Sequence, residues 1–401
     1  MKILITTDWY KPVVNGVVTS VLNLKSELEK AGHQVKVLTL SQTGKPYYED
    51  GAYYLRSFKV KIYPQARATY SFRSHFLPEI LKWKPDVIHS QCEWASFYFA
   101  KYISQKLNIP IVHTYHTIYE DYTHYLPRGI RLGKKLVLMG TNHVVNKTDY
   151  VITPTDKARK LLLSYGIENP IVTIPTGISL DKYGVRLTAE RRDVLRKKYG
   201  IADGRKLLVT VGRLGKEKNV DELIDDMAVL VRKRPEYTLL IVGGGPYKEE
   251  LVQRVKNLQM EEHIVFTGMV PPSEVHEYFK LGQVFLCASQ SEAQGLTYIE
   301  ALASGVPLLC KDDDCLEGVL ADGYNGFRFK DSRQFCDRLE EIVGNENKYR
   351  EMCLNASFSA DRFSKENFGH QLEKVYRAAV ETFPGHTGSR FRRLTKLVRK
   401  R

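Results

Sequence analysis

Two short apolar runs decide the fold class of this chain: residues 207–212 read LLVTVG and residues 238–243 read TLLIVG. Each run is apolar at consecutive positions, which is typical of parallel strands that are covered on both faces. A stretch with helical spacing, Val220–Arg234, lies between them. The order strand, helix, strand predicts an α/β domain built on a parallel sheet.

The same alternation occurs twice along the 401 residues, so two doubly wound domains are expected, each with its ligand side at the carboxyl ends of its strands. The expected strands are 2–7, 34–40, 86–90, 110–115, 150–153 and 171–174, followed by 206–212, 238–243, 263–268, 283–288 and 306–310. The predicted parts are a first domain 1–178, a linker with a charged helix 179–205, a second domain 206–360, a helix 361–383 and a basic tail 384–401.

The net charge of +14 is distributed unevenly along the chain. Residues 1–180 hold 23 basic and 13 acidic residues (+10), residues 181–383 hold 30 and 33 (−3), and residues 384–401 hold seven basic residues and no acid (+7). Such an excess favours an anionic partner: nucleic acid, an acidic membrane surface or a phosphorylated ligand. No nucleic-acid-binding module is present, so nucleic acid is not an expected partner.

The ends and the cysteines exclude several protein classes. The opening MKILITTDWY lacks the apolar core and cleavage site of a signal peptide, and no run approaches the roughly 18 apolar residues of a spanning helix. The six cysteines form no CxxC pair, so buried thiols are expected rather than zinc or disulfides. These features predict a cytoplasmic protein that could lie on a membrane surface.

The densest chemical signal is Ser289–Pro307, SQSEAQGLTYIEALASGVP, where a strand ends in a loop that opens a helix. Gly295 lets the backbone approach a ligand closely, and the first amides of the helix would bind an anion. Glu292 and Glu300 lie on either side of that point. Two carboxylates so placed could hold the hydroxyls of two sugar rings that flank a diphosphate.

This string resembles the E-x7-E signature of the retaining glycosyltransferases of family four, which have the GT-B fold. The resemblance covers residues 2–383 and implies two Rossmann-like domains facing a cleft, with a C-terminal helix that crosses back to the first domain. It implies that Glu292 binds the donor sugar, that the amides after Gly295 bind the diphosphate and that Glu300 binds the ribose. The donor-binding residues implied are Gly16, Arg213, Lys218, Val270, Glu292, Gln294, Gly295, Leu296, Thr297 and Glu300, and the catalytic residues are His116, Arg213, Lys218 and Glu292.

Arg213 and Lys218 follow the first strand of the second domain, where fixed cations suit the charge on a leaving diphosphate. In the first domain, Asn15-Gly16 opens a helix after the first strand. His113 and His116 would face opposite sides of an extended strand, so they are not expected to share a metal ion. The resemblance places His116 against the donor sugar.

Two further strings allow other interpretations that we do not favour. Asp312-Asp313-Asp314 could be a DxD metal motif, but its position after a strand favours helix capping. Gly243-Gly244-Gly245 lacks the GxGxxG spacing and predicts a tight turn lining the nucleotide site. No tightly bound cofactor and no metal site are therefore predicted, and Mg²⁺ would act only as a stimulant.

Three basic, amphipathic segments point to the acceptor. Residues 51–85 hold seven basic residues and one acidic residue, interleaved with aromatic residues. Residues 126–145 and the tail also combine basic and apolar residues. Residues 126–145 could equally form a helix that packs on the protein's own core. The three segments predict docking on the cytoplasmic face of an anionic phospholipid bilayer. The residues expected there are Lys59, Lys61, Arg67, Arg73, Lys82, Lys84, Arg128, Arg131, Lys134, Lys135, Arg392 and Arg393.

Within family four, residues 113–126, HTYHTIYEDYTHYL, and the basic first domain are similar to the bacterial diacylglycerol glucosyltransferases. The similarity implies UDP-glucose as donor, diacylglycerol as acceptor and a 3-α-glucosyl lipid as product. Three alternatives stay open: another acceptor (phosphatidylinositol, a lipid-linked sugar or a soluble sugar), a GT-B nucleotide-sugar epimerase, and a membrane-binding protein without activity.

Overall fold

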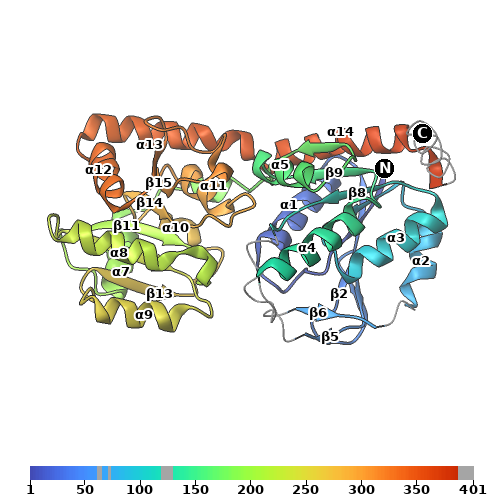
Figure 1. Cartoon of the computed structure of the whole chain (residues 1–401), viewed down its shortest axis with the longest axis horizontal. Helices are drawn as coiled ribbons and strands as arrows, with labels where there is room; N and C mark the ends of the chain where they lie inside the picture. The colour runs from blue at the N-terminus through green and yellow to red at the C-terminus, as the bar shows by residue number, and fades with distance from the viewer. Residues whose placement is uncertain (61–65, 71–73, 119–129, 387–401) are drawn as a thin grey trace. The chain divides into compact units, whose positions relative to one another are not determined.

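The chain folds into two α/β units, and the computed structural model describes residues 1–60, 66–70, 74–118 and 130–386, with side chains in 130–137 excepted. The first unit contains Met1–Gly177 and the segment from Lys365 onward; the second contains Ile178–Ser364. Each unit has a parallel sheet with helices on its faces (Figure 1). The expectation of two doubly wound domains is confirmed.

The first unit is built on an eight-stranded sheet of order β10-β9-β8-β7-β1-β2-β4-β3, in which only the β3–β4 pair is antiparallel. Its strands are β1 Lys2–Thr6, β2 Gln34–Leu40, β3 Tyr47–Glu49, β4 Ala52–Leu55, β7 Val87–Ser90, β8 Ile111–Thr114, β9 Tyr150–Thr153 and β10 Ile171–Thr173. β5 Phe58–Lys59 and β6 Arg67–Ala68 form a separate antiparallel pair. The helices are α1 Gly16–Lys30, α2 Phe76–Trp83, α3 Ala95–Leu107, α4 Ile130–Val145, α5 Asp156–Ser164 and α14 Lys365–Thr382.

The second unit has a six-stranded parallel sheet of order β13-β12-β11-β14-β15-β16. Its strands are β11 Lys206–Val211, β12 Tyr237–Val242, β13 Ile264–Gly268, β14 Val284–Cys287, β15 Leu308–Lys311 and β16 Gly326–Phe329. Its helices are α6 Asp181–Gly184, α7 Ala189–Lys198, α8 Val220–Val231, α9 Lys248–Asn257, α10 Val275–Phe279, α11 Leu296–Ala303, α12 Ser332–Val343 and α13 Glu346–Ala360, with 3₁₀ turns η2 Lys216–Lys218, η3 Asp314–Leu316 and η4 Asp361–Phe363.

All eleven strands expected from the sequence are present, with ends within two residues of those predicted. The short strands β3 to β6 and β16 were not predicted. Residues 52–55 do not belong to the predicted membrane-facing segment 51–85, because Ala52, Tyr53, Tyr54 and Leu55 are all buried between β2 and β3. Their apolar side chains pack into the core of the first unit.

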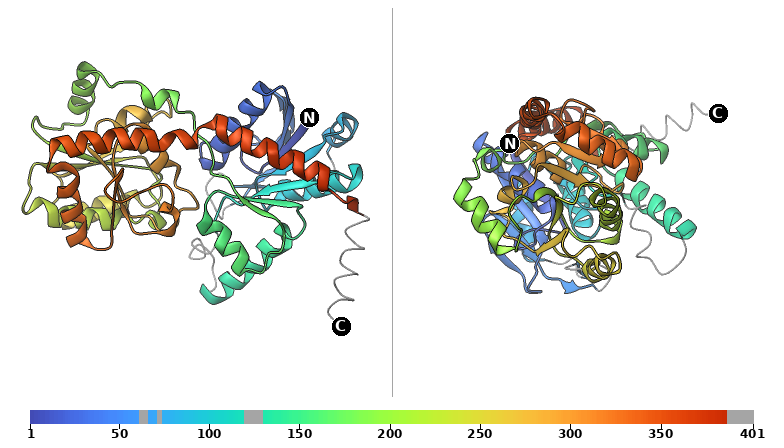
Figure 2. Two further views of the ribbon diagram at one scale, coloured as in Figure 1. Left: turned by 90° about the horizontal axis from the view of Figure 1, so that it is seen from above. Right: turned by 90° about the vertical axis from the view of Figure 1, so that its left-hand side faces the viewer.

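The C-terminal helix α14 returns to the first unit, as expected, and packs there against α1 (Figures 1 and 2). Phe368, Leu372 and Tyr376 join the same apolar core as the β1 and α1 side chains. A Cβ atom on Gly369 would lie 2.8 Å from Glu27 Cβ, so the two helices meet where residue 369 has no side chain.

Candidate active site

The candidate donor site lies at the point where the strand order of the second sheet reverses. The order runs β13-β12-β11 in one direction and β14-β15-β16 in the other, so the connections from β11 and β14 leave the sheet in opposite directions. Open α/β sheets bind ligands at the carboxyl ends of the strands at such a switch point. Arg213 and Lys218 follow β11, and Glu292, Gln294 and Gly295 follow β14, so the sheet brings both predicted motifs to the same place.

The loop after β11 is braced by the glycines that follow β12. A Cβ atom on Gly243 would lie 1.9 Å from the Gly212 carbonyl oxygen, and one on Gly245 would lie 2.3 Å from that of Leu214. The Leu214 amide donates to the Gly244 carbonyl at 3.0 Å. The glycine string is therefore the tight turn that its spacing predicted, and it fixes the backbone that carries Arg213.

Both predicted cations are held by carboxylates. Lys218 Nζ lies 2.5 Å from Glu292 Oε1, with both side chains partly buried. The Arg213 guanidinium pairs with Glu217, whose own side chain is buried. Ser291 Oγ donates to the Glu217 carbonyl at 3.0 Å, which ties the β11 and β14 loops together. The ion pairs hold the side chains of Arg213 and Lys218 in place, so that these side chains would need little rearrangement to bind an anion.

Gly295 starts α11 in a conformation that other residues adopt with strain. Its φ is 70° and its ψ is 71°, in the left-handed region, and a Cβ there would lie 2.3 Å from the Tyr298 ring. The first intrahelical bond is the one from the Tyr298 amide to the Gly295 carbonyl. The Leu296 and Thr297 amides precede that bond, so they and the helix dipole can receive an anion.

Glu300 lies one turn into α11, and its Oε1 accepts a hydrogen bond of 2.5 Å from the Tyr183 hydroxyl of α6. Burial raises the pKa of Glu300, while Tyr183 and Lys182 oppose that shift. A carboxylate that already receives one donor keeps lone pairs for a second, such as a sugar hydroxyl.

Of the remaining predicted donor residues, Val270 and Gln294 follow strands of the second sheet, whereas Gly16 belongs to the first unit. Val270 follows β13 and packs, half-buried, on the apolar core of the second unit. Gln294 is buried directly before Gly295. Gly16 is the first residue of α1 in the first unit, where Asn15 caps the helix by accepting from the Val18 amide at 2.9 Å.

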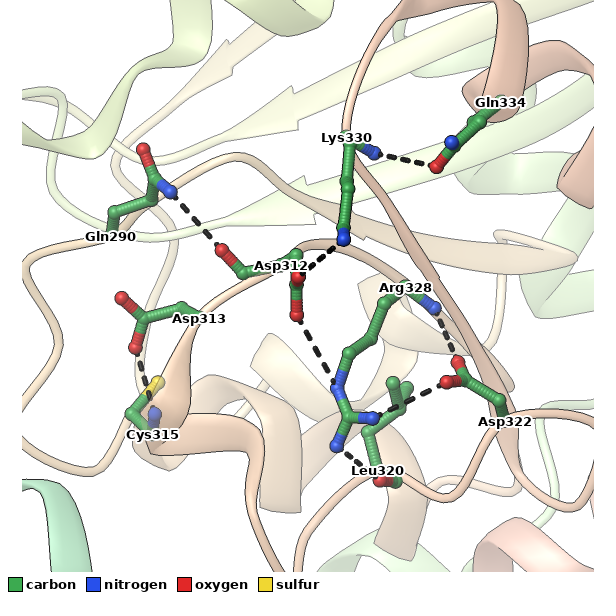
Figure 3. Close-up of polar contacts among 9 residues, drawn as sticks. All are labelled: Gln290, Asp312, Asp313, Cys315, Leu320, Asp322, Arg328, Lys330 and Gln334. Carbon is green, nitrogen blue, oxygen red and sulfur yellow. Dashed lines mark hydrogen bonds and ion pairs between the residues drawn. The ribbon is translucent and has the colours of Figure 1, made fainter.

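The acidic run after β15 is occupied by caps and ion pairs (Figure 3). Asp313 Oδ1 accepts from the Cys315 amide at 2.8 Å, which confirms the predicted cap. Asp312 faces Arg328 at 3.9 Å and Lys330 at 3.6 Å, and its carbonyl accepts from Gln290 at 3.1 Å. Within the described ranges, no three His, Cys, Asp or Glu side chains gather as metal ligands would.

In the first unit the strand order reverses between β1 and β7, and a buried polar cluster lies at that edge. His116 follows β8, and its Nε2 lies 2.6 Å from Gln91 Oε1, which follows β7. Burial lowers the pKa of His116 to about 4, against the opposing effect of Glu93. The imidazole is therefore neutral at pH 7.

His113 and His116 have different hydrogen-bond partners. His113 is fully buried, its Nε2 lies 3.3 Å from Glu93 Oε1, and its ring packs edge-on against Phe97. It therefore serves the packing of the first unit.

The predicted membrane-facing cations have different environments. Lys59, Lys82 and Lys84 are exposed. Arg67 instead fastens the β5–β6 pair, because its Nε donates to Ser57 Oγ at 2.7 Å and its Nη2 to the Ser57 carbonyl at 3.2 Å. Arg131, Lys134 and Lys135 lie in the first half of α4, where only the backbone is described. Lys61, Arg73, Arg128, Arg392 and Arg393 lie outside the described residues.

Sequence reasoning missed the partners of the predicted residues: Tyr183, Glu217 and Gln91. Gln91 directly follows an expected strand, so its place at the ligand edge could have been inferred. Tyr183 lies 117 positions from Glu300, and no sequence pattern links the two. No helix in the described part of the chain has the length and apolarity needed to span a bilayer.

Both units match family models of glycosyltransferases. Residues 14–182 match the family described as Glycosyltransferase Family 4, and residues 191–357 match Glycosyl transferases group 1. The solved structures with this fold include sucrose-phosphate synthase from Thermosynechococcus elongatus (TM-score 0.74, 18% identity, 94% of this chain and 98% of that one). Anabaena HepE in complex with UDP and glucose is similar too (TM-score 0.70, 17% identity, 94% and 100%). These structures share the GT-B fold.

Two curated relatives extend over most of the chain. The alpha-monoglucosyldiacylglycerol synthase of Streptococcus pneumoniae is 33% identical over 382 residues, covering 95% of this chain and 86% of that protein. The enzyme of the same name from Acholeplasma laidlawii is 30% identical over 393 residues, covering 94% and 96%. The chain therefore belongs to glycosyltransferase family 4 and is, as its sequence predicted, a retaining, UDP-sugar-dependent glycosyltransferase.

Proposed function

We propose that this protein transfers glucose from UDP-glucose to diacylglycerol, with retention of configuration, to give 3-α-monoglucosyldiacylglycerol at the cytoplasmic membrane surface. The observation that carries the proposal is the Lys218–Glu292 pair beside the α11 N-terminus, in a chain that matches two monoglucosyldiacylglycerol synthases almost end to end. The ion pair supports sugar transfer as the reaction. The names of the two relatives support glucose as the transferred sugar and diacylglycerol as the acceptor.

The leaving UDP is stabilised by Arg213, Lys218 and the amides of Leu296 and Thr297. The bond from the anomeric carbon to the diphosphate breaks while the acceptor oxygen attacks the same face of the sugar. The acceptor's proton passes to the departing phosphate oxygen, so no separate base is needed. Negative charge grows on that phosphate, and fixed cations and helix amides bind it more strongly in the transition state than in the ground state.

Glu292 and Glu300 bind hydroxyl groups in this mechanism. Glu292 receives hydroxyls of the transferring sugar while it orients Lys218. Glu300 receives the ribose hydroxyls with the lone pairs that Tyr183 leaves available. Gly16, at the start of α1, and His116 contact the transferring sugar from the first unit.

Exposed groups on the β5–β6 pair support contact with a bilayer. Phe58 of β5 and Tyr70, which lies two residues after β6, are 42% and 73% exposed, and their rings stack with centroids 5.6 Å apart. Figure 1 labels both strands. Lys59 lies beside Phe58 and is exposed. Aromatic rings next to lysine suit the headgroup region of an anionic membrane.

A donor-by-acceptor panel tests the proposal. Purified protein is given radiolabelled UDP-glucose, UDP-galactose or GDP-mannose, with diacylglycerol or phosphatidylinositol in anionic or neutral vesicles, or with soluble sugars. We expect label in an α-glucosyl lipid only with UDP-glucose and diacylglycerol, with the anomer assigned by proton NMR. Transfer to soluble sugars alone would exclude a lipid acceptor, and epimerised donor without transfer would indicate an epimerase.

A further inference from the structure

A buried carboxamide holds the imidazole of His116 in one protonation state. Gln91 is 2% exposed, and its Oε1 lies 2.6 Å from His116 Nε2. An amide oxygen only accepts hydrogen bonds, so His116 Nε2 must carry the proton and donate it. The other ring nitrogen, Nδ1, is then an acceptor with its lone pair available.

The other charged and titratable groups near His116 have partners of their own. Glu93 Oε1 lies 3.3 Å from His113 Nε2. His89 uses both ring nitrogens, with Tyr376 Oη at 2.6 Å and Thr114 Oγ1 at 2.7 Å. Glu93 favours a protonated His116 and His113 disfavours it. Within the described residues, Gln91 is therefore the side chain that selects the tautomer of His116.

We propose that Gln91 is a positioning residue of the transfer reaction: it holds His116 as the neutral Nε2–H tautomer, so that Nδ1 accepts a hydrogen bond from a hydroxyl of the transferring sugar. This inference rests on the contact between His116 and the sugar in the proposed function. It assigns to Gln91 a role that acts through His116, without contact with the reacting atoms.

The chemistry of the step explains why an amide suits this position better than a carboxylate. Sugars pass through an oxocarbenium-like transition state when the glycosidic bond breaks, so positive charge grows on the ring. A carboxylate at position 91 would stabilise imidazolium, because an opposite charge nearby favours the charged form. Imidazolium has no lone pair for the hydroxyl and would repel the developing charge on the sugar.

Gln91 itself carries a cost that fits a functional constraint. Its Nε2 is buried and has no hydrogen-bond partner among the described residues. An unsatisfied buried donor costs about 1–3 kcal/mol. Leucine would avoid that cost, but it would leave the His116 tautomer unselected.

The tautomer is measured directly in the full chain. Nitrogen-15 NMR of histidine-labelled protein, with His116 assigned by comparison with His116→Ala, is expected to show protonated Nε2 and bare Nδ1 at pH 7. Gln91→Leu should shift His116 toward a mixture of tautomers. Protonated Nδ1 in the wild type, or an unchanged spectrum in Gln91→Leu, would overturn the inference. The readout needs no acceptor, so its failure is distinguishable from a wrong choice of lipid.

The kinetic test uses Gln91→Glu, which keeps the size of the side chain. The acidic limb of the kcat profile should move up by about 1–3 pH units from its origin near the His116 pKa of about 4. Activity should be low at the acidic end and recover as His116 loses its proton. The matched control is Gln105→Glu on the exposed face of α3, whose profile should equal that of the wild type. If the acidic limb of the Gln91→Glu profile stayed at the same pH as in the wild type, residue 91 would have only a packing role.

Discussion

At the scale of single residues, Lys218 is the cation whose loss should separate binding from chemistry. Lys218→Ala should lower kcat by about 10²–10³-fold, the usual effect of removing one group that stabilises charge in the transition state. The dissociation constant for UDP-glucose should change far less, since the diphosphate keeps Arg213 and the α11 amides. Single-turnover rates and calorimetric titration measure the two effects.

The control is Lys216→Ala, which removes an exposed lysine from the same 3₁₀ turn. Its kcat should equal that of the wild type. If Lys218→Ala weakened donor binding and kcat equally, Lys218 would bind ground state and transition state alike.

Gly295 is expected to tolerate no side chain. Gly295→Ala adds about 1–2 kcal/mol of backbone strain at positive φ and places a methyl group against the Tyr298 ring. Gly200→Ala is the matched control: it has φ of 64° in the same unit, with nothing within 4 Å of the added Cβ. Both variants should lose stability in thermal unfolding, but only Gly295→Ala should weaken UDP binding in titrations. Equal UDP affinities would show that α11 does not receive the diphosphate.

Asp8 makes the stability of the protein fall as pH rises toward 7. Burial raises its pKa to about 7, with Glu93 adding to the shift and the Ser96 hydrogen bonds opposing it. Between the unfolded pKa near 4 and the folded pKa near 7, the native state binds more protons than the unfolded state, so stability is lost as pH increases. Asp8→Asn should remove this loss and gain on the order of 3 kcal/mol at pH 8 and little at pH 4.

Denaturant unfolding at both pH values measures this effect. Asp203→Asn, at an exposed position, is the control and should unfold like the wild type at both. A stability gain for Asp8→Asn that did not depend on pH would mean that its carboxyl is ionised in the native state.

At the scale of elements, α14 is the last described helix yet belongs to the core of the first unit. Leu372 is fully buried there, so Leu372→Ala should cost about 2–5 kcal/mol, while Lys374→Ala, on the exposed face, should cost almost nothing. The tryptophans, Trp9, Trp83 and Trp94, all lie in the first unit, so their fluorescence reports its unfolding selectively. An unshifted fluorescence transition for Leu372→Ala would contradict the packing of α14 on α1.

At the scale of the whole molecule, the charge is separated between a basic first part and tail and a slightly acidic second part. Binding to anionic vesicles should therefore fall steeply between 0.05 M and 0.5 M salt, as the screening length shrinks from about 14 Å to about 4 Å. Sedimentation with anionic and neutral vesicles measures this. Binding that ignores both salt and lipid charge would contradict an electrostatic contact.

A pair of surface variants locates the contact. Phe58→Ser with Tyr70→Ser should reduce vesicle binding without changing the unfolding transition. Phe358→Ser removes a phenylalanine that is 66% exposed on α13 in the second unit, and it should bind like the wild type. A larger loss for Phe358→Ser would move the membrane contact to the other unit.

The sequence by itself determined the two parallel sheets and the donor motif. Runs such as 207–212 are apolar at most consecutive positions because a strand that is covered on both faces buries both sets of side chains, and this signal is local. Gly295 and the two glutamates are likewise adjacent on one loop and helix. The short strands were not predicted because four residues are too few to show a clear pattern. In Ala52–Leu55, moreover, aromatic side chains are equally compatible with a protein core and with a membrane surface.

Only the tertiary structure decided which side chains meet. Glu300 meets Tyr183 from 117 positions away, Lys218 meets Glu292 across 74, and His116 meets Gln91 because β7 and β8 are neighbours in the sheet. These pairings follow from strand order and from helix packing over the whole chain. A sequence pattern reports the spacing of apolar residues within one helix or strand. A hydrogen-bond partner depends on how several helices and strands pack against one another.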